Sequence, residues 1–126
     1  MNVILNTPLN FTISSAKLVV EDDGRGTIEF TLLDQPVRLN LASTDYVYDT
    51  IFAVNDRVKL LQSFGQFDIN TTGTLIGIIA DDTEDLADVL FDTIFPDQIF
   101  KPVEAHVILQ ALSLLVRVPL RYLQKI

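Results

Sequence analysis

The sequence lacks most of the side chains that catalytic sites are built from. Its 126 residues include no cysteine, no tryptophan and one histidine, His106. The absence of cysteine excludes a disulfide framework, a thiol nucleophile and a thiolate metal site. A single histidine excludes a metal site built from several imidazoles, and a Ser-His-Asp triad would have to use it. The motifs Gly-x-Ser-x-Gly and His-Glu-x-x-His are also missing. We therefore favour a protein that is not an enzyme, and we predict no cofactor.

Basic side chains are scarce as well. Nine lysines and arginines face 17 acidic residues, which gives a net charge of −8. An acidic protein repels phosphate backbones, so the sequence predicts no nucleic-acid partner. The charge is unevenly distributed. Residues 1–100 carry 16 acidic and 5 basic side chains, whereas residues 101–126 carry one acidic and four basic side chains. The acidic part favours a basic protein partner, because opposite charges accelerate association.

Long hydrophobic runs are missing too. The N-terminal residues 1–6 include no basic residue and lead into no long apolar segment, so no signal peptide is evident. The longest apolar stretch, 103–118, is interrupted by polar residues, and a bilayer span needs about 20 apolar residues. We therefore predict no membrane partner and a cytoplasmic location.

The apolar fraction of 48% and the eight phenylalanines are sufficient for a packed core. A chain of this length is typical of one domain, so we expect a single domain over residues 1–126. Alternating polar and apolar residues predict strands at 17–21, 27–32 and 37–41, joined by short turns into an antiparallel meander. We interpret the segment 21–26 between the first two strands as a hairpin turn rather than an anion-binding loop, because three acids lie in it. The side chains predicted to face the core from 27–32 are Ile28, Phe30 and Leu32.

Three later segments predict helices around one buried strand. Residues 47, 51, 54, 58 and 61 are apolar and recur at steps of four and three, which favours a helix that ends by Gly65. Residues 74–80 are continuously apolar and predict a strand buried on both faces. A second helix is expected to begin at Asp81 or Asp82 and to end before Pro96, and a third is expected over 103–117. The expected fold is therefore α+β, with two or three helices packed on one face of a mainly antiparallel sheet.

The terminal helix 103–117 carries a narrow polar stripe. Its polar side chains are His106, Gln110, Ser113 and Arg117, and apolar residues occupy most of the remaining perimeter. Such a helix has to be covered on most sides, so we expect it to be an oligomer interface. Alternatively, the stripe lines a ligand pocket. His106 and Ser113 would lie about 10.5 Å apart along the helix axis, which disfavours direct proton transfer between them.

A second candidate site is an acidic cluster that follows the buried strand. Carboxylates at Asp81, Asp82, Glu84 and Asp85 could hold Mg²⁺ or Ca²⁺. Their spacing does not match an EF-hand loop, and acidic residues are equally typical of a helix start. We favour the capping interpretation over the metal site. We also expect Asp85 and Asp88 to lie on a solvated helix face.

The function that these features favour is an acidic, non-enzymatic protein–protein interaction module. It would act as an adaptor, an inhibitor of the immunity-protein kind or an assembly accessory, and it would form a homo-oligomer through residues 103–118. One alternative is a small-ligand-binding protein or enzyme with a pocket lined by His106 and Arg117. Another is a carboxylate metal site at residues 81–85.

Overall fold

The computed structural model describes residues 2–6, 11–13, 16–21, 23–48, 50–80 and 83–126, and these residues form a mainly antiparallel β structure. The described chain contains eleven strands, one α-helix and one short 3₁₀ helix. In chain order these are β1 (Val3–Leu5), β2 (Phe11–Ile13), β3 (Lys17–Val20), β4 (Gly26–Leu32), β5 (Gln35–Leu41), β6 (Tyr46–Tyr48), β7 (Arg57–Leu60), β8 (Thr72–Ala80), β9 (Asp85–Phe91), α1 (Pro102–Ala111), β10 (Val116–Pro119), η1 (Leu120–Tyr122) and β11 (Leu123–Lys125).

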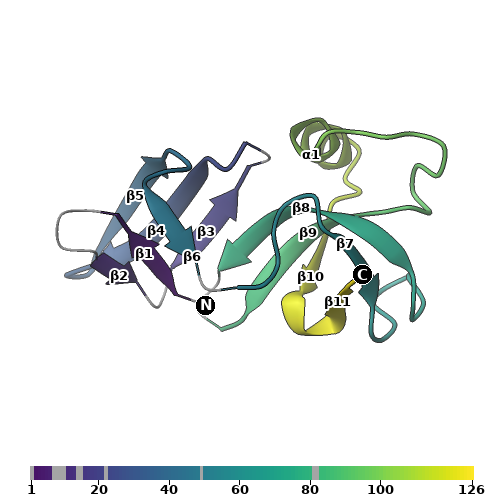
Figure 1. The fold of residues 1–126 in the computed structure, drawn as a ribbon, viewed down its shortest axis with the longest axis horizontal. Helices are drawn as coiled ribbons and strands as arrows, with labels where there is room; N and C mark the ends of the chain where they lie inside the picture. Colours follow the sequence, from purple (N-terminus) through teal and green to yellow (C-terminus); the bar gives the residue numbers. More distant parts are fainter. Residues whose placement is uncertain (1, 7–10, 14–15, 22, 49, 81–82) are drawn as a thin grey trace.

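Strand β8 joins the two halves of the molecule (Figure 1). Along one of its edges, the beginning of β8 pairs with β7 and its end pairs with β3, while β9 occupies the other edge. The main sheet therefore has the order β10-β9-β8-β3-β4-β5, and β7 continues to β11. A smaller sheet of order β2-β1-β6 lies beside the β3–β5 meander (Figure 1). This arrangement buries β8 as the sequence predicted, with Leu75, Ile76, Ile78 and Ile79 all in the interior.

The predicted meander is present, because β3, β4 and β5 are neighbours in the sheet. Its predicted inner face is correct only near the core. Ile28 is fully buried and Phe30 is partly buried, but Leu32 is exposed. Burial therefore decreases toward the hairpin tip, where Leu33 and Asp34 form a tight turn with positive φ values of 50° and 62°.

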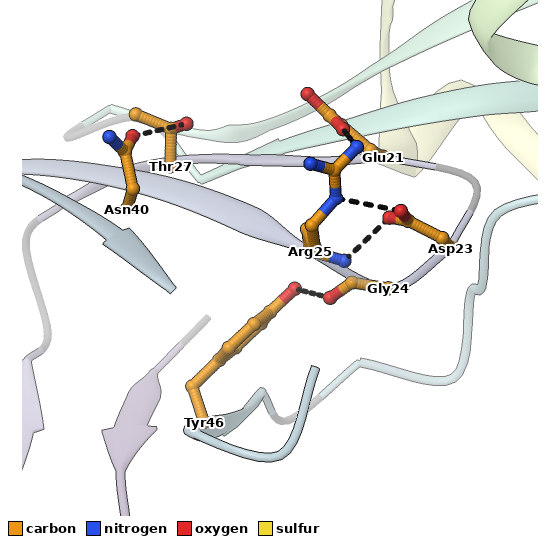
Figure 2. A network of polar contacts seen from close by, with 7 residues as sticks. All are labelled: Glu21, Asp23, Gly24, Arg25, Thr27, Asn40 and Tyr46. Carbon is orange, nitrogen blue, oxygen red and sulfur yellow. Dashed lines mark hydrogen bonds and ion pairs between the residues drawn. The ribbon is translucent and has the colours of Figure 1, made fainter. Parts of the chain in front are cut away.

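The turn between β3 and β4 is held by its own polar groups (Figure 2). The Arg25 guanidinium binds Asp23 at 2.7 Å and Glu21 at 2.9 Å, so the basic side chain offsets the acids around it. Tyr46 on β6 donates a hydrogen bond from its hydroxyl to the Gly24 carbonyl at 2.7 Å, and burial raises the pKa of Tyr46 to about 12. This contact connects the smaller sheet to the meander and is consistent with a hairpin turn.

The prediction of a helix that ends by Gly65 is wrong, because this part of the chain contains β6 and β7 instead. Asn55 adopts a left-handed conformation with φ of 78°, which ends any regular run at that point. In the following strand, Val58 and Leu60 are buried whereas Arg57 is exposed, a period of two residues. Ile51, which the helical spacing placed on the inner face, is 76% exposed.

The helix expected between residue 81 and Pro96 is also wrong, because residues 85–91 form β9. This strand pairs with β8 on one edge and β10 on the other. Its residues Ala87, Val89 and Phe91 are fully buried, and Leu90 is partly buried on the opposite face. A strand covered on both faces carries apolar residues at many spacings, so the helical pattern was accidental.

The third predicted helix is present but shorter than expected. Pro102 lies in its first turn as predicted, and α1 ends at Ala111. Ser113 has φ of 57°, and the Leu114 N–H donates to the Leu109 carbonyl at 2.8 Å, which closes the helix end. The chain then returns to the sheet as β10.

The described residues therefore contain a single α-helix, and the expected fold with two or three helices is corrected to a mainly antiparallel β fold. No helix among these residues is long and apolar enough to cross a membrane.

The buried centre of β8 gives a direct test of this architecture. Ile76 is almost fully buried against Ala105 and Leu109 of α1. We expect Ile76→Asp to lower the free energy of unfolding by about 4 kcal/mol or more, because it places an unpaired charge in an apolar interior. The measurement is urea denaturation. The matched control is Ile51→Asp at an exposed position, which should change stability by about 0.5 kcal/mol or less. Similar effects of the two substitutions would contradict the described packing.

Candidate functional site

A buried carboxylate lies at the centre of the candidate site. Asp88 is in the middle of β9 and is 1% exposed, and it is the one buried polar or charged residue among the residues that the structure describes. An ionised carboxylate loses several kcal/mol of hydration when it leaves water, so it must be paired to be tolerated there. The groups that pair with Asp88 therefore identify the site.

Two side chains bind this carboxylate from different elements, Arg117 from β10 and His106 from α1. Arg117 lies directly opposite Asp88 in the β9–β10 register. Its Nε donates to Oδ1 at 2.9 Å and its Nη2 donates to Oδ2 at 3.3 Å. The His106 Nε2 atom lies 2.9 Å from Asp88 Oδ2. Because an ionised carboxylate only accepts hydrogen bonds, Nε2 must carry the proton that it donates.

Gly77 makes room for this contact. It faces Asp88 in the β8–β9 register, next to an irregularity between Leu75 and Gly77. A Cβ atom at Gly77 would lie 2.8 Å from His106 Cε1, closer than such atoms can approach. The missing side chain therefore allows the imidazole of α1 to lie against the sheet and to reach Asp88.

The balance of these interactions keeps Asp88 ionised. Burial acts to raise the pKa of Asp88, while the hydrogen bonds from His106 and Arg117 and their charges lower it. The net result is a pKa below the ordinary value of 3.8. The carboxylate therefore carries its charge at neutral pH, and the three side chains form a cluster that ties α1 and β10 to β9. We call Asp88, His106 and Arg117 the carboxylate cluster.

The carboxylate cluster resembles half of an acid–base site, because an aspartate that orients a histidine is part of many catalytic triads. A triad also needs a nucleophile within hydrogen-bond reach of the imidazole. Among the described residues, no hydroxyl group hydrogen-bonds to His106. In the described residues the cluster therefore pairs a buried charge and orients the imidazole of His106.

The structure brings together only part of the predicted polar stripe. His106 and Arg117 both bind Asp88, although Arg117 reaches it from a strand and not from the helix. Gln110 is exposed near the end of α1, and Ser113 follows the helix in its left-handed turn. The sequence interpretation missed Asp88, which was expected on a solvated helix face with Asp85. The available signal was a single acid between the apolar residues 86–87 and 89–91.

The acidic cluster is only partly described. Asp81 and Asp82 lie outside the described residues. Glu84 accepts a hydrogen bond from Arg121 Nε at 2.9 Å, and Asp85 begins β9 rather than a helix. The helix that these acids were expected to cap is therefore wrong, because residues 85–91 form a strand. No group of three or more potential metal ligands is found within the described part of the chain.

Comparisons with models of known protein families, with curated protein sequences and with solved structures gave no match. Functional inference for this chain therefore rests on the geometry and chemistry of its own residues.

The carboxylate cluster predicts a pH-dependent contribution to stability. We expect Asp88→Asn to lower the free energy of unfolding at pH 7 by about 2 kcal/mol or more, because it weakens the three charge-assisted hydrogen bonds from His106 and Arg117. Since the pKa of Asp88 is lowered by folding, this stabilisation is complete well above pH 3.8 and is lost as pH falls through 3.8 toward the folded-state pKa. Urea denaturation of both proteins across this pH range measures the difference. Asp97→Asn, at an exposed position, is the matched control and should show little effect at any pH.

Gly77 and His106 should be energetically coupled. We expect Gly77→Ala to destabilise the protein by about 1–3 kcal/mol, because the added methyl group displaces the imidazole from Asp88. In a His106→Ala background the same substitution should cost much less, since the clashing ring is absent. A double-mutant cycle on the free energy of unfolding measures this coupling. Additive effects would show that Gly77 does not serve to seat His106.

Proposed function

We propose that this protein is a non-enzymatic interaction module that self-associates through the outer face of α1. The observation that carries the proposal is the exposure of apolar residues on this outer face, where Glu104 and Gln110 flank Val107. Helices on protein surfaces place apolar residues toward the core and polar residues toward water. In α1, Ala105 and Leu109 already form the inner face, yet Val107 on the opposite side is also apolar and is 63% exposed.

The neighbouring positions extend this surface. Ala111 is exposed one turn after Val107, and its small side chain permits close approach of another helix. Beyond the end of α1, Leu112 and Leu114 are exposed as well. These four exposed residues lie within eight positions of one another in the chain. Contiguous exposed apolar groups are typical of interfaces, whereas isolated ones are common on any surface. We call Val107, Ala111, Leu112 and Leu114 the α1 surface.

The charge distribution favours a second copy of this chain as the occupant. With a net charge of −8, two copies repel each other across most of their surfaces. The four residues of the α1 surface are uncharged, and the one charged residue in α1, Glu104, lies one turn before Val107. A two-fold contact there therefore limits the like charges from α1 itself to the two copies of Glu104. Such a contact is self-complementary, because each helix packs against the same helix of its partner.

The acidic residues of the N-terminal part remain outside this contact. They leave the dimer a surface that attracts basic protein partners, as expected of an adaptor, an inhibitor or an assembly accessory. A catalytic role is less well supported. The only histidine donates to a buried aspartate, and the described residues offer no nucleophile bonded to it.

The test is the molar mass in solution. We expect the wild-type protein to sediment as a dimer at micromolar concentrations and above, and Val107→Asp to sediment as a monomer because it places two negative charges in the contact. Val47→Asp introduces the same charge at an exposed valine on β6 and should leave the dimer intact. Circular dichroism checks that both variants are folded. A monomeric wild-type protein, or equal behaviour of the two variants, would overturn the proposal.

A further inference from the structure

A cleft of about 650 Å³ opens next to the carboxylate cluster, where β10 begins. Its walls come from three segments that are distant in sequence. They are the turn between β7 and β8, the residues after β9, and the chain between α1 and β10. Clefts of roughly 300–1,000 Å³ are typical of sites for small organic molecules. The size therefore suits a ligand rather than a single ion.

Most of the lining is apolar. Phe64, Phe67, Ile94, Leu115 and Val116 contribute to it. Phe67 is buried and stacks on Phe91 with ring centroids 4.2 Å apart, so this part of the wall is fixed by the core. An apolar ligand body placed there would lose contact with water, which favours its binding.

Among the residues that the structure describes, Arg117 is the only charged one that lines the cleft. The other polar groups along it are Gln66, Thr93 and Ser113, all of them neutral. A cleft whose single charge is positive is unusual in a chain with a net charge of −8. This arrangement favours an anionic head group on an otherwise apolar molecule.

The carboxylate cluster orients the Arg117 guanidinium and leaves some of its N–H donors available for such a ligand. Asp88 occupies the side of the guanidinium formed by Nε and Nη2. The end formed by Nη1 and Nη2 keeps three N–H donors that have no acceptor among the described residues, and 43% of the side chain is exposed. A guanidinium that is already oriented loses less entropy on binding, and its paired donors match a carboxylate.

We propose that this cleft binds an amphipathic monocarboxylate of the medium-chain fatty-acid type. The carboxylate accepts hydrogen bonds from the free end of Arg117, and the hydrocarbon chain packs against Phe64, Phe67 and Ile94. A single negative charge fits better than a phosphate dianion, because Asp88 already offsets the charge of Arg117. The proposal does not require self-association, and the cleft shares one residue, Leu114, with the α1 surface.

The first experiment uses the wild-type chain and three probes with the same hydrocarbon chain. Octanoate, octan-1-ol and octylamine are titrated below their micellar concentrations while amide resonances are followed by NMR. We expect octanoate to bind at least about tenfold more tightly than the other two, because only it can pair with Arg117. Its shifts should centre on Gln66, Thr93 and Ser113. Equal binding of the three probes, or no binding of octanoate at millimolar concentration, would overturn the proposal.

The second experiment removes the charge. Arg117→Gln should weaken octanoate binding by about tenfold or more. Arg121→Gln is the matched control, because Arg121 is an exposed arginine that pairs with Glu84 and does not line the cleft. It should bind octanoate as the wild type does. Thermal denaturation checks the fold of both variants, and the wild-type comparison of head groups decides the question if Arg117→Gln does not fold. Unchanged octanoate binding by folded Arg117→Gln would contradict the assigned role.

Discussion

The ionised carboxylate of Asp88 constrains how this chain can fold. It lies in β9, a strand with a neighbour on each edge, and its side chain is buried. Water therefore does not solvate the charge. The charge is paired there by Arg117 on β10 and His106 on α1, and a buried charge that loses a partner is strongly destabilising. A well-packed apolar residue in place of such a pair is often as stable. We therefore interpret the cluster as a device that selects one arrangement, because a shift in the β9–β10 register or a rotation of α1 would leave the carboxylate unpaired.

The helix depends on this constraint more than the strands do. Each strand of the main sheet is held by backbone hydrogen bonds to its neighbours, whereas α1 contacts the sheet mainly through Ala105 and Leu109. Ten residues give little intrinsic helical stability. The bond from His106 to Asp88 adds a directional contact that fixes the rotation of α1 about its axis. That rotation places Val107 outward. The contact between His106 and Asp88 therefore determines which residues of α1 form its exposed surface.

Sequence reasoning succeeded where local pattern and final environment agree. Strict alternation at 27–32 and the apolar run at 74–80 predicted β4 and β8, and Pro102 predicted the start of α1. It failed at 86–94, where apolar residues at steps of three and four also suit a strand covered on both faces, and at 47–61, where the same steps run across two short strands and the loop between them. Only pairing with distant segments decides between these structures. The same limit hid the role of Asp88, because its partners lie 18 and 29 residues away.

Three local anomalies have one common explanation. Gly77 lies inside an apolar strand where glycine costs stability, Asp88 is a lone acid in an apolar segment, and His106 is a polar residue in an apolar helix. Each alone looks like a tolerated exception. Together they are the parts of one contact, because the glycine admits the imidazole and the imidazole pairs with the acid. The fourth part, Arg117, uses one edge of its guanidinium for the contact and also lines the cleft. The interaction that orders the interior therefore also orients Arg117, the one charged residue that lines the cleft in the described part of the chain.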